Sequence, residues 1–127
     1  MAKIPSFISE ITDEMVNAAV SAFQNEKFIL GESVFKFEEE FAKYIGTRYA
    51  IAVNSGSSAI QLSLMSLGLR ENADVITSTN SFVASANTIK MANSNPILID
   101  INESDGNLNI DSAKNSADAI VPVHIYG

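Results

Sequence analysis

A short turn of serine and glycine follows an apolar stretch and precedes a helical pattern. Residues 51–60 read IAVNSGSSAI. The first amides of a helix have no partner inside the helix, and the helix dipole adds roughly half a positive charge there. Gly56 permits a tight turn, while Ser57 and Ser58 each offer an amide and a hydroxyl. This junction is typical of phosphate sites in α/β proteins and predicts a phosphorylated ligand.

The same turn has an interpretation without a ligand, in which Ser57 only caps the helix. The letters SGSS include neither the lysine of a P-loop nor the three spaced glycines of a dinucleotide-binding turn. The turn alone therefore supports both interpretations equally.

Phe82 is a second candidate because it follows the next apolar stretch and begins another helical pattern. Taken alone, it is better explained as an ordinary core aromatic. Beside the turn at residues 55–58, its ring could instead form a flat wall. A phosphate turn with an aromatic wall suits a phosphorylated planar cofactor, of which pyridoxal phosphate is the obvious example.

His124 is the only histidine and is expected at the carboxyl end of a strand. Because the chain has no cysteine and no second histidine, a metal site has little support. A structural or substrate-adjacent role fits His124 better than acid–base catalysis.

Alternating helical and strand patterns must position these residues. Two amphipathic helices are expected first, one capped by Thr12 and the other beginning near Ser33. After them, strands are expected at residues 48–54, 74–78, 96–101 and 119–125, and helices at residues 57–67, 81–92 and 111–117.

Strands separated by helices predict an α/β fold, a mostly parallel sheet with flanking helices. Such sheets bind ligands at the carboxyl ends of their strands, so residues 55–58, 79–82 and 124–127 are expected to converge on one edge. The pattern divides the chain into a helical segment, residues 1–46, and an α/β portion, residues 47–127.

Composition narrows the class of protein. The 127 residues are 46% hydrophobic, enough for one domain, and carry a formal charge of -7 without a basic stripe. Nucleic acid is therefore an unexpected partner. There is no cysteine, no signal peptide and no apolar run of about 18 residues, so we expect a cytoplasmic protein without a membrane partner.

The chain resembles the N-terminal part of the DegT/StrS-type sugar aminotransferases, which are pyridoxal-phosphate enzymes of the aspartate-aminotransferase fold, fold type I. Short motifs carry the resemblance, each weak alone but specific in this order and spacing. They are IP at residues 4–5, FILG at 28–31, FEEEFA at 37–42, AVNSGSSA at 52–59, SFVASAN at 81–87 and PVHIYG at 122–127.

The resemblance implies that Gly56, Ser57 and Ser58 bind the cofactor phosphate and that Phe82 stacks on the pyridine ring. Serine here replaces the commoner threonine and alanine and keeps or adds hydroxyl donors. The implied reaction moves an amino group from a donor, typically glutamate, to a keto group on a nucleotide-linked sugar. The implied assembly is a homodimer with shared active sites, to which residues 28–31 of the partner contribute.

The resemblance also implies an incomplete, truncated large domain. In the family, the carboxylate on the pyridine nitrogen and the lysine that forms the Schiff base follow the motif at residues 122–127. None of the six lysines, at positions 3, 27, 36, 43, 90 and 114, lies in a matching context. We therefore expect no catalytic residue here, no transamination by the isolated chain, and self-association through uncovered apolar surface.

Two other classes stay open. One is a non-catalytic module that binds a phosphosugar, and the other is a half-protein that works only with a missing C-terminal portion. Phe82 favours the cofactor because a ring wall serves a pyridine better than a sugar.

Overall fold

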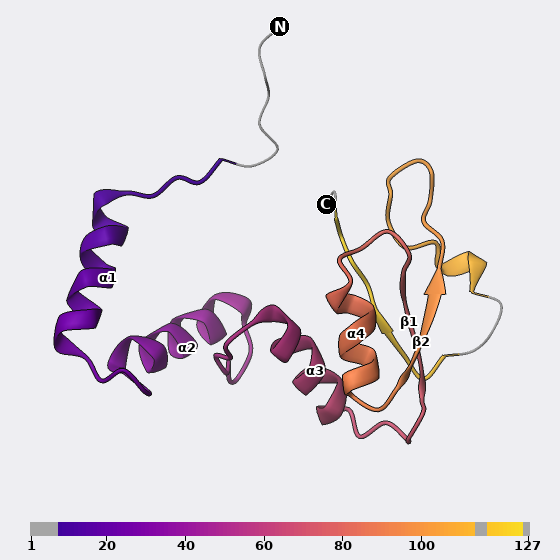
Figure 1. Cartoon of the computed structure of the whole chain (residues 1–127), viewed down its shortest axis with the longest axis horizontal. Coiled ribbons are helices and arrows are strands. Elements are labelled where there is room, and N and C mark those ends of the chain that lie inside the picture. Colours follow the sequence, from indigo (N-terminus) through magenta and orange to yellow (C-terminus); the bar gives the residue numbers. More distant parts are fainter. Residues whose placement is uncertain (1–7, 114–116, 126–127) are drawn as a thin grey trace, which may run out of the picture. The chain divides into compact units, whose positions relative to one another are not determined.

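The computed structural model describes residues 8–113 and 117–125. By its internal contacts the chain divides into two compact units, residues 1–52 and residues 53–127. Figure 1 shows the elements in chain order. Within the described residues, no helix is both long enough and apolar enough to cross a membrane.

Two helices form the first unit, as predicted. Helix α1, Asp13–Asn25, begins at Thr12, whose Oγ1 accepts a hydrogen bond of 3.3 Å from the Met15 amide. Helix α2, Glu32–Ile45, ends at Gly46, which adopts the left-handed conformation (φ 80°) that glycine tolerates best. The predicted cap at Thr12 is confirmed.

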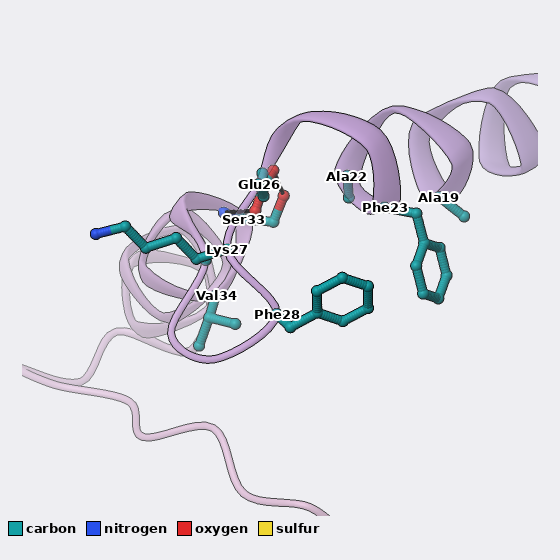
Figure 2. A pocket seen from close by; sticks show the side chains of 9 residues that line it. Ala19, Ala22, Phe23, Glu26, Lys27, Phe28, Ser33 and Val34 are labelled. Carbon is teal, nitrogen blue, oxygen red and sulfur yellow. Dashed lines mark hydrogen bonds between the residues drawn. The ribbon is translucent and has the colours of Figure 1, made fainter.

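The loop between α1 and α2 is closed by a carboxylate. Glu26 Oε2 accepts from the Ser33 amide at 2.9 Å, and the Ser33 hydroxyl donates to Oε1, which Figure 2 shows. The hydroxyl and then the amide lower the pKa of Glu26. A Cβ on Gly31 would lie 2.6 Å from Glu26 Oε2 and 2.9 Å from the Lys27 carbonyl oxygen. The loop therefore requires glycine at this position.

The second unit contains the sheet. Its elements are α3 (Gly56–Ser66), β1 (Asp74–Ser78), α4 (Ala84–Met91), β2 (Asn95–Ile99), the 3₁₀ turn η1 (Ile110–Ser112) and β3 (Ala119–Val121). The strand order is β2-β1-β3, and both pairs are parallel. The predicted α/β class with a parallel sheet and flanking helices is confirmed.

The core of this unit lies where the helices meet the sheet. Helix α4 packs on β1 and β2, and α3 packs on α4. Leu64 of α3, Val75 of β1 and Ile89 of α4 form the buried cluster, the latter two with no exposed surface. Burial of each such side chain contributes about 1.5–3 kcal/mol of hydrophobic stabilisation. This packing fixes the positions of α3 and α4 against the sheet.

The structure contradicts the predicted strand at residues 48–54. No strand forms there, and the side chain of Ile51 is 81% exposed. The Ala52 amide donates to a carboxylate oxygen of Glu38 at 2.7 Å, and not to the carbonyl of a neighbouring strand. An apolar alternating pattern shows that a segment can be a strand, but the partner must come from elsewhere in the fold.

Other boundaries also differ from the predictions. Helix α4 begins at Ala84, three residues later than expected, because residues 79–82 form the preceding loop. The expected helix at residues 111–117 is only η1, with residues 114–116 outside the described part. Strand β3 ends at Val121 because Pro122 has no amide to donate to a ladder.

A polar network aligns the amino ends of the three strands. Asp118, before β3, accepts from Arg70 Nη2 at 2.7 Å and Nε at 3.3 Å, and from the Asp74 amide at 2.8 Å. Asp74 Oδ1 in turn accepts from Asn95 Nδ2 at 2.9 Å. These bonds connect the first residues of β1 and β2 with the residue before β3.

We expect Asp118→Ala to lower the free energy of unfolding by about 0.5–1.5 kcal/mol, because the Asp74 amide loses its acceptor. Arg70→Ala should cost less, because Arg70 is 63% exposed and the bond from Asp74 to Asp118 persists. Urea unfolding followed by circular dichroism measures both. If Asp118→Ala loses no more free energy of unfolding than Arg70→Ala, the role of Asp118 as the acceptor of the Asp74 amide would be contradicted.

Candidate functional site

The turn before α3 is organised by Ser55. Its Oγ accepts from the Ser58 amide at 3.1 Å and donates to the Ser58 Oγ, also at 3.1 Å. The Ser55 carbonyl accepts from the Ala59 amide at 3.0 Å. Ser55 is therefore the N-cap, and the interpretation of Ser57 as the cap is wrong. Both positions carry serine, so the residue types alone do not tell the cap from its neighbour.

Ser55 leaves the next donors free. Among the described residues, no acceptor pairs with the amides of Gly56 or Ser57, and the Ser57 hydroxyl has no partner. A Cβ added to Gly56 would meet no atom within 4 Å, so the space beside the turn is open. Two amides and a hydroxyl at the positive end of an 11-residue helix suit an anion with several acceptor oxygens.

Phe82 lies outside the core. It follows β1, its side chain is 76% exposed, and its carbonyl accepts from the Ser85 amide at 3.0 Å. The loop that carries it is fixed to the sheet, because the Thr79 amide donates to the Ile99 carbonyl at 3.0 Å. The interpretation of Phe82 as a core aromatic is contradicted, and its role against a cofactor ring stays a prediction.

Parallel pairing brings two of the three predicted segments to one edge. Residues 79–82 follow β1 and residues 122–125 follow β3, so both start at the carboxyl ends of paired strands. His124 is exposed there, while residues 126–127 lie outside the described part. Residues 55–58 do not follow a strand of this sheet, and their convergence with the other two segments stays a prediction.

Lys90 lies at the other edge. It occupies the last turn of α4, and its Nζ is 3.4 Å from Oδ1 of Asn95, the first residue of β2. The amino ends of parallel strands are opposite the edge where such sheets bind ligands. The other described lysines belong to residues 8–52, and Lys3 and Lys114 lie outside the described residues. Within residues 53–125 as described, no lysine lies at the carboxyl edge.

Comparison with known proteins defines the class. The sequence profile of the DegT/DnrJ/EryC1/StrS aminotransferase family matches residues 9–127. The chain belongs to this family. The match includes the turn at residues 55–58 and Phe82, the two features that the residues alone had indicated.

Individual relatives agree with this assignment. The chain is 36% identical over 104 residues to the GDP-perosamine synthase of Caulobacter vibrioides, covering 77% of this chain and 28% of that protein. It is 30% identical over 118 residues to the dTDP-3-amino-3,4,6-trideoxy-alpha-D-glucose transaminase of Micromonospora megalomicea subsp. nigra. The match covers 90% of this chain and 32% of that protein.

Solved structures agree as well. One is the GDP-4-keto-6-deoxy-D-mannose-3-dehydratase of E. coli with bound hydrated PLP. It is similar with a TM-score of 0.82 and 26% identity, covering 96% of this chain and 34% of that one. The chain spans about a third of the length of the relatives it matches.

The cap assignment predicts different effects of two neighbouring serines on stability. Ser55→Ala removes the acceptor of the Ser58 amide and should lower the free energy of unfolding by about 1 kcal/mol. Ser57→Ala should change it by less than about 0.5 kcal/mol. Urea unfolding of both variants measures the difference. Equal destabilisation of the two variants would contradict the assignment of Ser55 as the N-cap.

Proposed function

We propose that this chain supplies the cofactor-phosphate site of a pyridoxal-phosphate-dependent aminotransferase that acts on nucleotide-linked keto sugars with a glutamate-type amino donor. The observation that carries the proposal is the pair of free amides at Gly56 and Ser57. Family membership supports the reaction class. Its relatives, which include a dTDP-sugar transaminase, support the substrate class.

The residues present fit the cofactor. The amides of Gly56 and Ser57 and the Ser57 hydroxyl donate to the phosphate oxygens, and Ser58 closes the turn through its bonds with Ser55. The exposed ring of Phe82 offers a flat apolar face to a pyridine. When bound, pyridoxal phosphate supplies the electron sink for amino-group transfer.

In this proposal the described residues bind and orient, and none of them is catalytic. Lys90 is held at the amino edge of the sheet through Asn95, away from the edge where the loop of Phe82 begins. Because no lysine of residues 53–113 or 117–125 lies at the carboxyl edge, the proposal is that the isolated 127-residue chain binds the phosphate but transfers no amino group. Residues 1–46 form the helical segment and residues 47–127 the α/β portion of the large domain.

The proposal includes a homo-oligomer. The first unit exposes large apolar side chains, among them Phe23 at 71% and Phe28 at 85%, whose rings meet edge to face at 6.0 Å. Both line a hollow of about 270 Å³, together with residues of the loop and of α2. Figure 2 shows how these side chains lie. Apolar surface of this kind supports burial against another subunit.

Phosphate binding should be measurable at single residues. In a ¹⁵N NMR titration with pyridoxal phosphate, the amide signals of Gly56 and Ser57 should shift most. Ser57→Ala removes a hydroxyl donor and should weaken the binding of pyridoxal phosphate by about tenfold. Gly56→Ala places a methyl group where the phosphate approaches and should weaken binding by a similar factor. Ser63→Ala is the matched control, because Ser63 is an exposed serine of the same helix.

Pyridoxal without the phosphate should bind much more weakly to the same chain. Shifts centred away from residues 55–58, or unchanged affinity in both variants, would contradict the phosphate site. Covalent fixation of the cofactor to one lysine after borohydride reduction would contradict the absence of a catalytic lysine.

Substitution of Phe82 tests whether the site binds the whole cofactor or only a phosphate. Phe82→Ala should weaken pyridoxal phosphate by about three- to tenfold through the lost ring contact and leave inorganic phosphate unchanged. Val83→Ala, which alters a neighbouring side chain that is 60% exposed, is the control for the loop. Calorimetry measures both ligands. Equal weakening of both, with tighter binding of a sugar phosphate, would favour a phosphosugar-binding module.

A further inference from the structure

A side chain of α3 bonds to the end of α4. Gln61 Nε2 donates to the Met91 carbonyl at 3.2 Å, across 30 residues of sequence. Gln61 lies in the middle of α3, and Met91 is the last residue of α4. Both helices belong to the second unit, residues 53–127. The bond is therefore a direct link between two helices inside one compact part of the chain.

The Met91 carbonyl depends on Gln61 for its partner. The next three backbone amides along the chain donate to the carbonyls of residues 88–90. A continued α-helix would give Met91 the amide of Asn95, four residues on. That amide donates instead to the Ala73 carbonyl at 2.8 Å, where β2 begins. Among the described residues, Gln61 is the only donor to the Met91 carbonyl.

Apolar packing and this bond constrain α3 and α4 in different ways. Leu64 of α3 and Ile89 of α4 belong to the buried cluster that holds the two helices together. Hydrophobic contact is not directional, whereas a hydrogen bond requires a donor–acceptor distance of about 3 Å and a nearly straight angle. The bond of Gln61 therefore adds a limit on how far α3 can slide or turn against α4.

We propose that Gln61 is a positioning residue, which sets the spacing between the two contacts of the cofactor. In the proposed function, the phosphate binds the amides of Gly56 and Ser57 at the start of α3. The ring contact comes from Phe82, two residues before α4. One ligand can reach both contacts only when α3 and α4 are aligned, and helices that shift freely lose that freedom on binding, which lowers the affinity. This inference rests on the proposed function.

Two ligands test the inference in the 127-residue chain. Gln61→Met keeps the length and helix propensity of the side chain but removes the donor. It should weaken pyridoxal phosphate by about two- to fivefold, and inorganic phosphate should bind unchanged because it contacts only the start of α3. The NMR signals of Gly56 and Ser57 report both affinities. The ¹⁵N signal of Ala92, whose nitrogen shares a peptide group with the Met91 carbonyl, reports the loss of the bond.

Three further variants separate alignment from other effects. Gln61→Lys keeps an N–H donor at the negative end of α4 and should restore the ratio of the two affinities. The ratio is compared because the added charge attracts both ligands. Ser63→Ala, an exposed serine of α3, is the matched control and should change neither affinity. In a Phe82→Ala background, Gln61→Met should cause no further loss, because no ring contact is left to align.

The outcomes distinguish the inference from the phosphate site. Equal weakening of both ligands in Gln61→Met would overturn the positioning role, as would unchanged affinity for pyridoxal phosphate, an unchanged Ala92 signal or a full further loss in the Phe82→Ala background. Each of these results leaves the phosphate site standing.

Circular dichroism checks the fold of each variant. If Gln61→Met loses helix, Gln61→Glu takes its place, because a carboxylate keeps the shape of the side chain but cannot donate. A wild-type chain that binds neither ligand at residues 55–58 would overturn the proposed function, and this inference with it.

Discussion

The unpaired amides at the start of a helix are the constraint on which this structure depends. A helix cannot satisfy its first donors, so each must find an acceptor from a side chain, water or a ligand. Helix α1 uses Thr12 and α2 uses Glu26 through Ser33. Helix α3 uses Ser55 for the Ser58 amide only, which leaves Gly56 and Ser57 with free donors. Among the described residues, the Asp13 and Glu14 amides of α1 have no acceptor either, but both side chains in that first turn are acidic. The first turn of α3 has no acidic residue, and in the proposed function its free donors bind the phosphate.

The two edges of the sheet serve different purposes. At the amino edge, Asp118, Asp74 and Asn95 use their polar groups on one another and on Arg70, so these charges hold the strands in register. At the carboxyl edge, the loop of Phe82 follows a buried strand and exposes its ring. In the proposed function, stability and ligand contact therefore depend on different residues at the two edges of one sheet.

Local patterns predicted the elements whose signals lie within a few residues. Strand β1 matches the prediction at both ends, and the Thr12 cap was visible from its type and position. The missing strand at residues 48–54 has a cause that is not local. The bond from Ala52 to Glu38 joins residues 14 apart, and no local pattern predicts it. Within the turn, the types of Ser55 and Ser57 are the same, so only the backbone decides which one caps.

The charge of the chain explains why the alignment of hydrogen-bond donors matters at the proposed phosphate site. The chain carries a formal charge of -7, and residues 55–58 include no lysine or arginine. A phosphate at the proposed site would therefore gain little from long-range attraction and would depend on short hydrogen bonds to amides and on the dipole of α3. Such bonds require donors already aimed at the ligand. In the proposed site, the two bonds between Ser55 and Ser58 supply part of this alignment, because they remove conformational freedom that binding would otherwise have to remove.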